Sequence, residues 1–273
     1  MKLGMYMKQP ILIGNSSRKE FQFIKNFVDI QDIISNKRTI VSSDLNLSDL
    51  NHFHDLNDLD APIEHPRQIF AVGFNYRDHS KELQTKLPSE PNIFTKFVSS
   101  LTGPSTTITL PSNKTDWETE LVIVVGKGGR NIQIDDAQNH IAGYMVGQDL
   151  SDRQLQFKNS NPQFSLAKSY ANFSPTGPWI TTTDQIDNLT NLKLTTKVNN
   201  VTKQKSTLGN LIFDDNALVS YLSKIVELYP GDLIFTGTPG GVGVGRNPQE
   251  FLQSGDYLTS QIDELGTLEL SFI

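Results

Sequence analysis

The sequence contains no cysteine in its 273 residues. Disulfides, thiolate nucleophiles, zinc–thiolate sites and iron–sulfur clusters are therefore excluded. No run approaches the roughly 18 apolar residues of a membrane-spanning helix, and the start of the chain lacks the apolar core of a signal peptide. We therefore expect a cytoplasmic protein with no membrane partner.

The sequence also lacks an excess of basic residues. Its 24 Lys and Arg stand against 30 Asp and Glu, which gives a net charge of -6, and no basic cluster offsets this balance. Because binding to nucleic acid depends on such clusters, we expect no nucleic-acid partner. Hydrophobic residues make up 37% of the chain, which at this length still allows a substantial core.

Most of the predicted secondary structure is strand, because short runs are rich in β-branched and aromatic residues. These runs cover residues 68–73, 92–97, 107–110, 118–125, 142–146, 179–182, 192–198, 233–236, 257–262 and 267–272. Residues 216–228 form the clearest predicted helix, since Leu218, Leu222 and Ile225 recur at helical spacing and Pro230 follows. Strands and helices do not alternate, so we expect an α+β fold that is predominantly β.

The composition changes near residue 66. Residues 1–65 are polar and rich in Asn, Asp and Ser, with a loose helical period over 20–34, and Pro62 and Pro66 bracket their end. The longer apolar runs all come later. We predict a small N-terminal module, residues 1–65, and a catalytic domain, residues 66–273.

Three carboxylates are the most informative feature of the chain. Glu118 and Glu120 stand two apart at the start of an apolar strand, so they point to the same face. Asp149 ends a second apolar stretch. An exposed strand with alternating Glu is the ordinary alternative, but acids on one face repel unless a cation lies between them. The pattern predicts a site for a hard divalent cation, Mg²⁺ or Mn²⁺.

Polar residues on both sides of the triad could complete a site. His79 and Glu82 are three apart, which makes them neighbours on a helix, and a carboxylate beside His favours a general base. Lys168, Arg153 and Gln156 could neutralise or orient a bound anion. The alternatives are a surface His–Glu pair and ordinary surface polarity.

A glycine-rich loop follows the strand at 233–236. Successive backbone N–H groups in such a loop can bind a small anion such as a carboxylate. No Gly-Lys-Ser/Thr follows, so the loop is not a P-loop, and it opens no helix of a dinucleotide-binding unit.

Taken in order, these segments resemble the fumarylacetoacetate hydrolase family over roughly residues 66–273. The segments that carry the resemblance are Gly73-Phe74-Asn75-Tyr76-Arg77-Asp78-His79, Phe94-Thr95-Lys96, Glu118-Thr119-Glu120-Leu121, Gly147-Gln148-Asp149-Leu150-Ser151, Ala167-Lys168-Ser169, Gly177-Pro178-Trp179 and Thr236-Gly237-Thr238-Pro239-Gly240-Gly241-Val242-Gly243. One segment alone would be weak, but the ordered set is specific. The resemblance implies a mixed β-sandwich roll with a small N-terminal module, and a homodimer.

The resemblance also implies roles for single residues. Metal ligands of the family match Glu118, Glu120 and Asp149, with Mg²⁺ expected first and Mn²⁺ or Ca²⁺ as alternatives. The family's water-activating dyad matches His79 and Glu82. Its substrate contacts match Gln156, Lys168 and Thr238, and we expect Arg153 and Gly237 beside them.

Two departures from the family pattern stand out. Residues 69–73 contain no acid, whereas fumarylacetoacetase itself has a further acidic ligand upstream of its catalytic His. This difference favours the smaller bacterial-type members. Asp152 stands where the family more often has Ala, which puts an added negative charge near the metal.

These expectations combine into a metal-dependent hydrolase that cleaves a C–C bond of a 2,4-diketo acid such as an acylpyruvate. His79, oriented by Glu82, would activate the water, and Lys168 would balance the substrate charge. The same site could instead isomerise a 2-hydroxy-dienedioate or decarboxylate oxaloacetate. A non-catalytic module that binds metal and a carboxylate is the third reading, which an intact His79–Glu82 pair disfavours.

Overall fold

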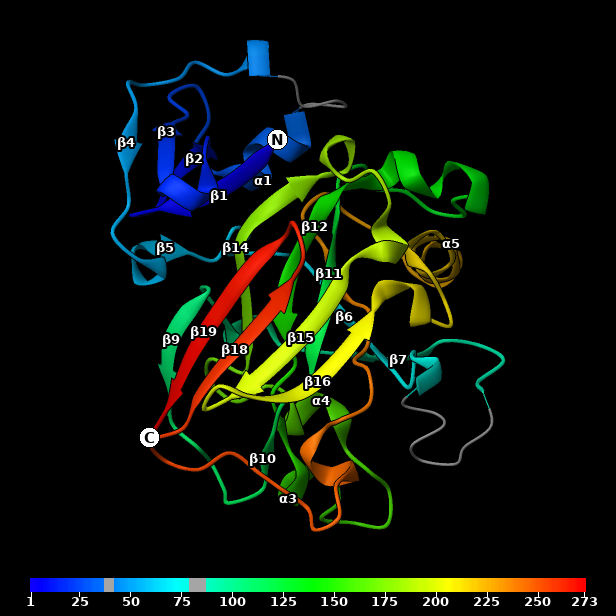
Figure 1. Cartoon of the computed structure of the whole chain (residues 1–273). Helices are drawn as coiled ribbons and strands as arrows, with labels where there is room; N and C mark the ends of the chain where they lie inside the picture. The colour runs from blue at the N-terminus through cyan, green and yellow to red at the C-terminus, as the bar shows by residue number, and fades with distance from the viewer. Residues whose placement is uncertain (37–41, 79–86) are drawn as a thin grey trace.

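The computed structural model describes residues 1–36, 42–78 and 87–273, and most of its regular structure is strand (Figure 1). In chain order the strands are β1 (Lys2–Tyr6), β2 (Gln9–Ile13), β3 (Glu20–Phe23), β4 (Asn51–His52), β5 (Leu59–Asp60), β6 (Ile69–Gly73), β7 (Asn92–Thr95), β8 (Leu101–Thr102), β9 (Ser105–Ile108), β10 (Thr115–Asp116), β11 (Thr119–Val125), β12 (Ile141–Gln148), β13 (Ser151–Asp152), β14 (Ser174–Thr182), β15 (Lys193–Val198), β16 (Val201–Thr207), β17 (Leu233–Phe235), β18 (Tyr257–Ile262) and β19 (Gly266–Phe272). The α-helices in this part of the chain are α1 (Ile30–Asn36), α3 (Arg153–Gln156), α4 (Phe164–Ala167) and α5 (Asp215–Ile225). Among the described residues, no helix is long and apolar enough to cross a membrane.

Two sheets form the body of the molecule. The larger sheet has the order β4-β3-β2-β1-β14-β12-β11-β17-β6-β7, with β5 added at β1 and β8 at β14. The smaller sheet has the order β16-β15-β18-β19-β9, and in Figure 1 it lies across β11 and β12. The predicted α+β, predominantly β fold is therefore confirmed.

Strand β11 lies at the centre of the large sheet and is buried on both faces. Leu121 and Ile123 point into the core between the sheets, where Leu268 of β19 also packs. Val122 and Val124 point to the opposite face, into a second core that includes residues of α1. Each such fully buried side chain contributes roughly 1.5–3 kcal/mol, which explains why the strand is a continuous apolar run.

The N-terminal residues extend the large sheet. Strand β1 pairs with β14, with Leu3 opposite Ile180, so residues from both sides of the predicted boundary share one sheet. The helical period expected over 20–34 is wrong in its first part, because residues 20–23 form β3 and α1 begins only at Ile30. Phe21 and Phe23 instead pair with β2 in an antiparallel hairpin. The division at residue 66 stays a prediction.

Three strand ends meet beside the start of β11. Strand β12 is antiparallel to β11, with Gly147 opposite Glu120. Strand β17 is antiparallel to β11 on its other side, and β6 runs parallel to β17. The start of β11 therefore lies next to the ends of β12, β17 and β6. Gly147 is required here, because a Cβ at this position would lie 2.4 Å from Val122 Cγ2.

Candidate active site

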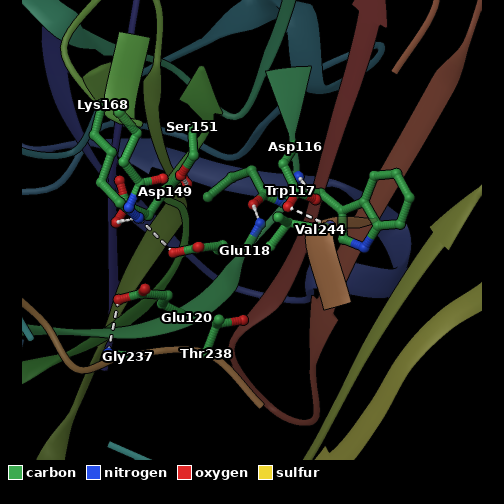
Figure 2. A network of polar contacts seen from close by, with 12 residues as sticks. Asp116, Trp117, Glu118, Glu120, Asp149, Ser151, Lys168, Gly237, Thr238 and Val244 are labelled. Atoms are coloured by element: carbon green, nitrogen blue, oxygen red, sulfur yellow. Dashed lines mark hydrogen bonds and ion pairs between the residues drawn. The ribbon is translucent and has the colours of Figure 1, made fainter. Parts of the chain in front are cut away.

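The register of β11 and β12 brings the three acids together. Glu118 precedes β11 and Asp149 follows β12, and the Asp149 amide donates to the Glu118 carbonyl at 2.9 Å. One carboxylate oxygen of each acid, Glu120 included, lies within 4.8 Å of the others (Figure 2). Glu120 and Asp149 are buried, while Glu118 reaches a cavity. The three acids that were predicted from sequence to share a site thus form one compact cluster.

The three carboxylates lie close enough for their negative charges to repel one another. Burial, together with the charges of Asp149 and Glu118, raises the pKa of Glu120 well above its ordinary value. Burial pushes the pKa of Glu118 in the same direction, but Lys168 and Arg153 outweigh it and hold that pKa at about 2. A cluster of three carboxylates with oxygen donors only fits a hard divalent cation, which would relieve this repulsion.

Lys168 lies directly against the triad. Its ammonium donates to Glu118 Oε2 at 2.5 Å and to Asp149 Oδ2 at 2.6 Å. Burial lowers the pKa of Lys168, but these two carboxylates outweigh it and raise the pKa above its ordinary value. Lys168 is therefore a fixed positive charge on the wall of the same cavity.

Arg153 connects the triad to the glycine-rich loop through Asp116. The guanidinium donates to Glu118 Oε1 at 2.5 Å and to Gln156 Oε1 at 2.8 Å, and its Nε donates to Asp116 Oδ2 at 2.9 Å. Asp116 is fully buried and also accepts from the Gly243 amide at 2.6 Å and the Val244 amide at 3.0 Å (Figure 2). Sequence reasoning gave Asp116 no role.

The residues after β17 are held against β11. The Gly237 amide donates to Glu120 Oε2 at 2.8 Å, and Thr238 Oγ1 donates to the Thr119 carbonyl at 2.9 Å. Gly237 has a φ of +96°, and a Cβ there would lie 2.9 Å from the Val72 carbonyl oxygen, so glycine is required. The amides of Gly237, Gly243 and Val244 thus bind the protein's own carboxylates.

A buried glutamine that the sequence did not single out supports Thr238. Gln204 of β16 donates to Thr238 Oγ1 at 2.8 Å and accepts from the Thr119 amide at 3.1 Å. Gln148 plays a parallel part in β12, since its Oε1 accepts from the Glu118 amide. The two glutamines connect both sheets to the start of β11.

One cavity of about 220 Å³ collects most of the predicted site. Its polar lining residues are Glu118, Glu120, Arg153, Gln156, Lys168 and Thr238. Its apolar lining residues include Val72, Phe74, Phe94, Phe157, Phe164, Val242 and Val244. Asp149 lies behind this wall, fully buried. His79 and Glu82 lie outside the described residues, and their roles stay predictions.

The hydrogen bonds of Asp152 go to residues outside the triad. Its Oδ1 accepts from the Gln154 amide at 3.1 Å, which caps the start of α3, and from Ser112 Oγ at 2.6 Å. The Tyr170 hydroxyl donates to its other oxygen at 3.3 Å. The Asp152 carboxylate therefore stabilises the start of α3, the helix that contains Arg153.

Comparison with known proteins identifies relatives of this chain. The chain is 44% identical over 210 residues to a protein named mitochondrial oxaloacetate tautomerase fahd2 from Xenopus laevis. The match covers 76% of this chain and 66% of that protein, so the chain spans about two thirds of the relative's length. Our expectation of a cytoplasmic protein stays a prediction.

Solved structures share the fold across the whole chain. A candidate HpcE protein from Mycobacterium smegmatis superposes with a TM-score of 0.90 at 42% identity, covering 100% of this chain and 99% of that one. A 5-carboxymethyl-2-hydroxymuconate delta-isomerase from the same organism gives 0.81 at 28% identity, with the same coverage. Residues 68–272 match the model for the C-terminal domain of fumarylacetoacetate hydrolase. The chain therefore belongs to the fumarylacetoacetate hydrolase family of enzymes.

Proposed function

We propose that the chain catalyses enol–keto tautomerisation of a small 2-oxo acid of the oxaloacetate type, with a divalent cation held by Glu118, Glu120 and Asp149. The observation that carries the proposal is the buried triad on the cavity that Lys168 and Arg153 also line. The reaction class comes from the 44% identity to a relative named an oxaloacetate tautomerase. The C–C hydrolase expected from sequence has weaker support than this alternative.

The cavity suits a small anion with an oxo group. When bound, the cation would supply Lewis-acid polarisation of the 2-oxo oxygen. Mg²⁺ is the first choice because the three carboxylates form a compact donor set made of oxygen alone.

Lys168 balances charge on the substrate. Its ammonium has three N–H groups, and two of them donate to Glu118 and Asp149. The third can face the cavity, where it would stabilise a carboxylate or the negative charge that develops on an enolate oxygen. Arg153 is held by Asp116 and Gln156 and donates to Glu118, so it would keep this carboxylate in position to bind the cation.

The reaction itself is a proton shift. Conversion of enol to keto form moves one proton from the enol oxygen to C3, so no water is consumed and no C–C bond breaks. We assign this transfer to His79, oriented by Glu82, on the basis of the family resemblance. General acid–base catalysis by such a group contributes about 10²–10⁴-fold.

A panel of substrates tests the proposal. Enol oxaloacetate is followed by its ultraviolet absorbance, pyruvate release reports decarboxylation, and an acylpyruvate reports C–C hydrolysis, each with Mg²⁺ present. We expect tautomerisation to be fastest and Glu118→Gln to abolish it. Glu227→Gln is the control, because Glu227 pairs with Arg130 on the surface. Faster acylpyruvate cleavage would replace the proposal with hydrolysis, and no turnover would favour a binding module.

A further inference from the structure

Lys96 is a buried lysine that follows β7 and that the proposed mechanism does not use. Its side chain is completely buried. The ammonium donates to Asp149 Oδ1 and to the Lys168 carbonyl, and the Phe173 carbonyl lies 3.4 Å away. An ammonium has three N–H groups, and these three acceptors use all of them. Lys96 is therefore locked in place and cannot turn toward a substrate.

Lys96 and Lys168 divide the two oxygens of Asp149 between them. Lys96 binds Oδ1 from within the core, whereas Lys168 binds Oδ2 from the cavity wall. Only Lys168 also contacts a second acid of the triad, Glu118. The oxygen that Asp149 directs toward the other acids is thus Oδ2, which a cation would share with Lys168 or take from it.

The other two acids follow the same pattern. Arg153 occupies Oε1 of Glu118, and the Gly237 amide occupies Oε2 of Glu120. On each of the three carboxylates, one oxygen is thus bound by a donor other than Lys168. The other oxygens, one from each acid, are those that a cation would use, and it would share Glu118 Oε2 and Asp149 Oδ2 with Lys168 or take them from it.

We infer that Lys96 is a positioning residue that makes Asp149 a one-oxygen ligand and thereby selects Mg²⁺ or Mn²⁺ over Ca²⁺. The inference rests on the cation site of the proposed function. Mg²⁺ requires near-octahedral geometry at short distances and uses single oxygens, whereas Ca²⁺ takes six to eight oxygens and readily binds both oxygens of one carboxylate. A triad restricted to three oxygens disfavours the larger ion.

The change to test is Lys96→Met, which keeps an unbranched apolar chain in the buried space. Loss of the ammonium frees Asp149 Oδ1, so a cation can bind both oxygens of that acid. Loss of a positive charge also strengthens the attraction for either cation, so single dissociation constants are ambiguous. The ratio of the Mg²⁺ and Ca²⁺ dissociation constants removes that common contribution.

Isothermal titration of the chelator-treated full chain with MgCl₂ and CaCl₂ measures this ratio. Mutation of residues that position metal ligands typically changes metal affinity about 10–100-fold, so we expect the ratio to shift at least about tenfold toward Ca²⁺. Lys193→Met, an exposed lysine on β15, removes the same charge and should leave the ratio unchanged. An equal ratio in Lys96→Met and wild type would overturn the inference.

Two further measurements separate this inference from the proposed function. Wild type that binds Mg²⁺ while Glu118→Gln does not supports the cation site, whatever Lys96 does; wild type that binds neither ion refutes both. If Lys96→Met does not fold, a crystal structure of wild type soaked in CaCl₂ decides the question. We expect one oxygen from Asp149 on the ion, and two would refute the role of Lys96.

Discussion

Asp116 should hold the site together, and replacing it with Asn tests this role. Its two oxygens accept from the amides of Trp117, Gly243 and Val244 and from Arg153, all within 3.0 Å. The side chain is fully buried. In Asp116→Asn an NH₂ group replaces one of the two carboxylate oxygens. This NH₂ group cannot accept a hydrogen bond, so it would face N–H donors without pairing with them. Arg153 would also lose its ionic partner.

The cost of this change follows from the contacts. Breaking a buried ion pair by removing one partner costs about 3–5 kcal/mol. For a chain of this length each kcal/mol lowers Tm by roughly 2–4 °C, so we expect a fall of about 6–20 °C. The Arg153 guanidinium and the loop at Gly243 also lose their shared anchor, so we expect a higher KM for the 2-oxo acid.

Calorimetry and steady-state kinetics measure the two effects separately. Asp232→Asn is the matched control, because Asp232 is equally buried and accepts from Gln68 and the Tyr229 amide at the opposite end of β17. It should lower Tm without raising KM. An Asp116→Asn variant with wild-type Tm and KM would refute the reasoning, as would an Asp232→Asn variant with the same rise in KM.

Other changes give equally direct predictions. Gln204→Leu should lower the free energy of unfolding in urea by about 1–3 kcal/mol, because the Thr119 amide loses its buried partner; an unchanged midpoint would contradict this. Gly147→Ala should cost about 1–3 kcal/mol through overpacking against Val122 and Phe235, seen as a lower Tm. Mg²⁺ at a hundred times its Kd should stabilise wild type by about 2.7 kcal/mol in thermal unfolding. Glu120→Gln should remove most of that gain, and an equal gain in both proteins would argue against the triad as the binding site.

The acid triad could be predicted from sequence because it depends on short-range rules. Two residues two apart on a strand share a face, which paired Glu118 with Glu120. Asp149 joined them because it ends the neighbouring apolar strand, and β11 and β12 are antiparallel. The ordered motifs then gave the family and the fold.

The residues that support the triad could not be predicted in the same way. Lys96 follows a short, half-exposed strand, and only the pairing of β7 with β6 and the position of Asp149 bury it. Gln204 lies in the other sheet, 85 residues from the Thr119 amide that it binds. Such contacts depend on packing between distant segments, which a single sequence does not reveal.

The N-terminal residues show a second limit. A loose helical period over 20–34 was outweighed at Phe21 and Phe23, whose rings pack edge to face at 5.2 Å while the backbone pairs with β2. A weak helical pattern in the sequence does not prevent strand formation when a neighbouring strand is available for pairing. Within this range only α1 is helical, and its Ile30, Ile33 and Ile34 pack against the large sheet.

The central claim is that Glu118, Glu120 and Asp149 bind the divalent cation of an enzyme that acts on 2-oxo acids. The most direct test is an anomalous difference map from crystals soaked in MnCl₂ and oxalate, a chelating mimic of the substrate. We predict a manganese peak between the three carboxylates, with oxalate beside Lys168 in the cavity. A peak elsewhere, or none at saturating Mn²⁺, would contradict the account.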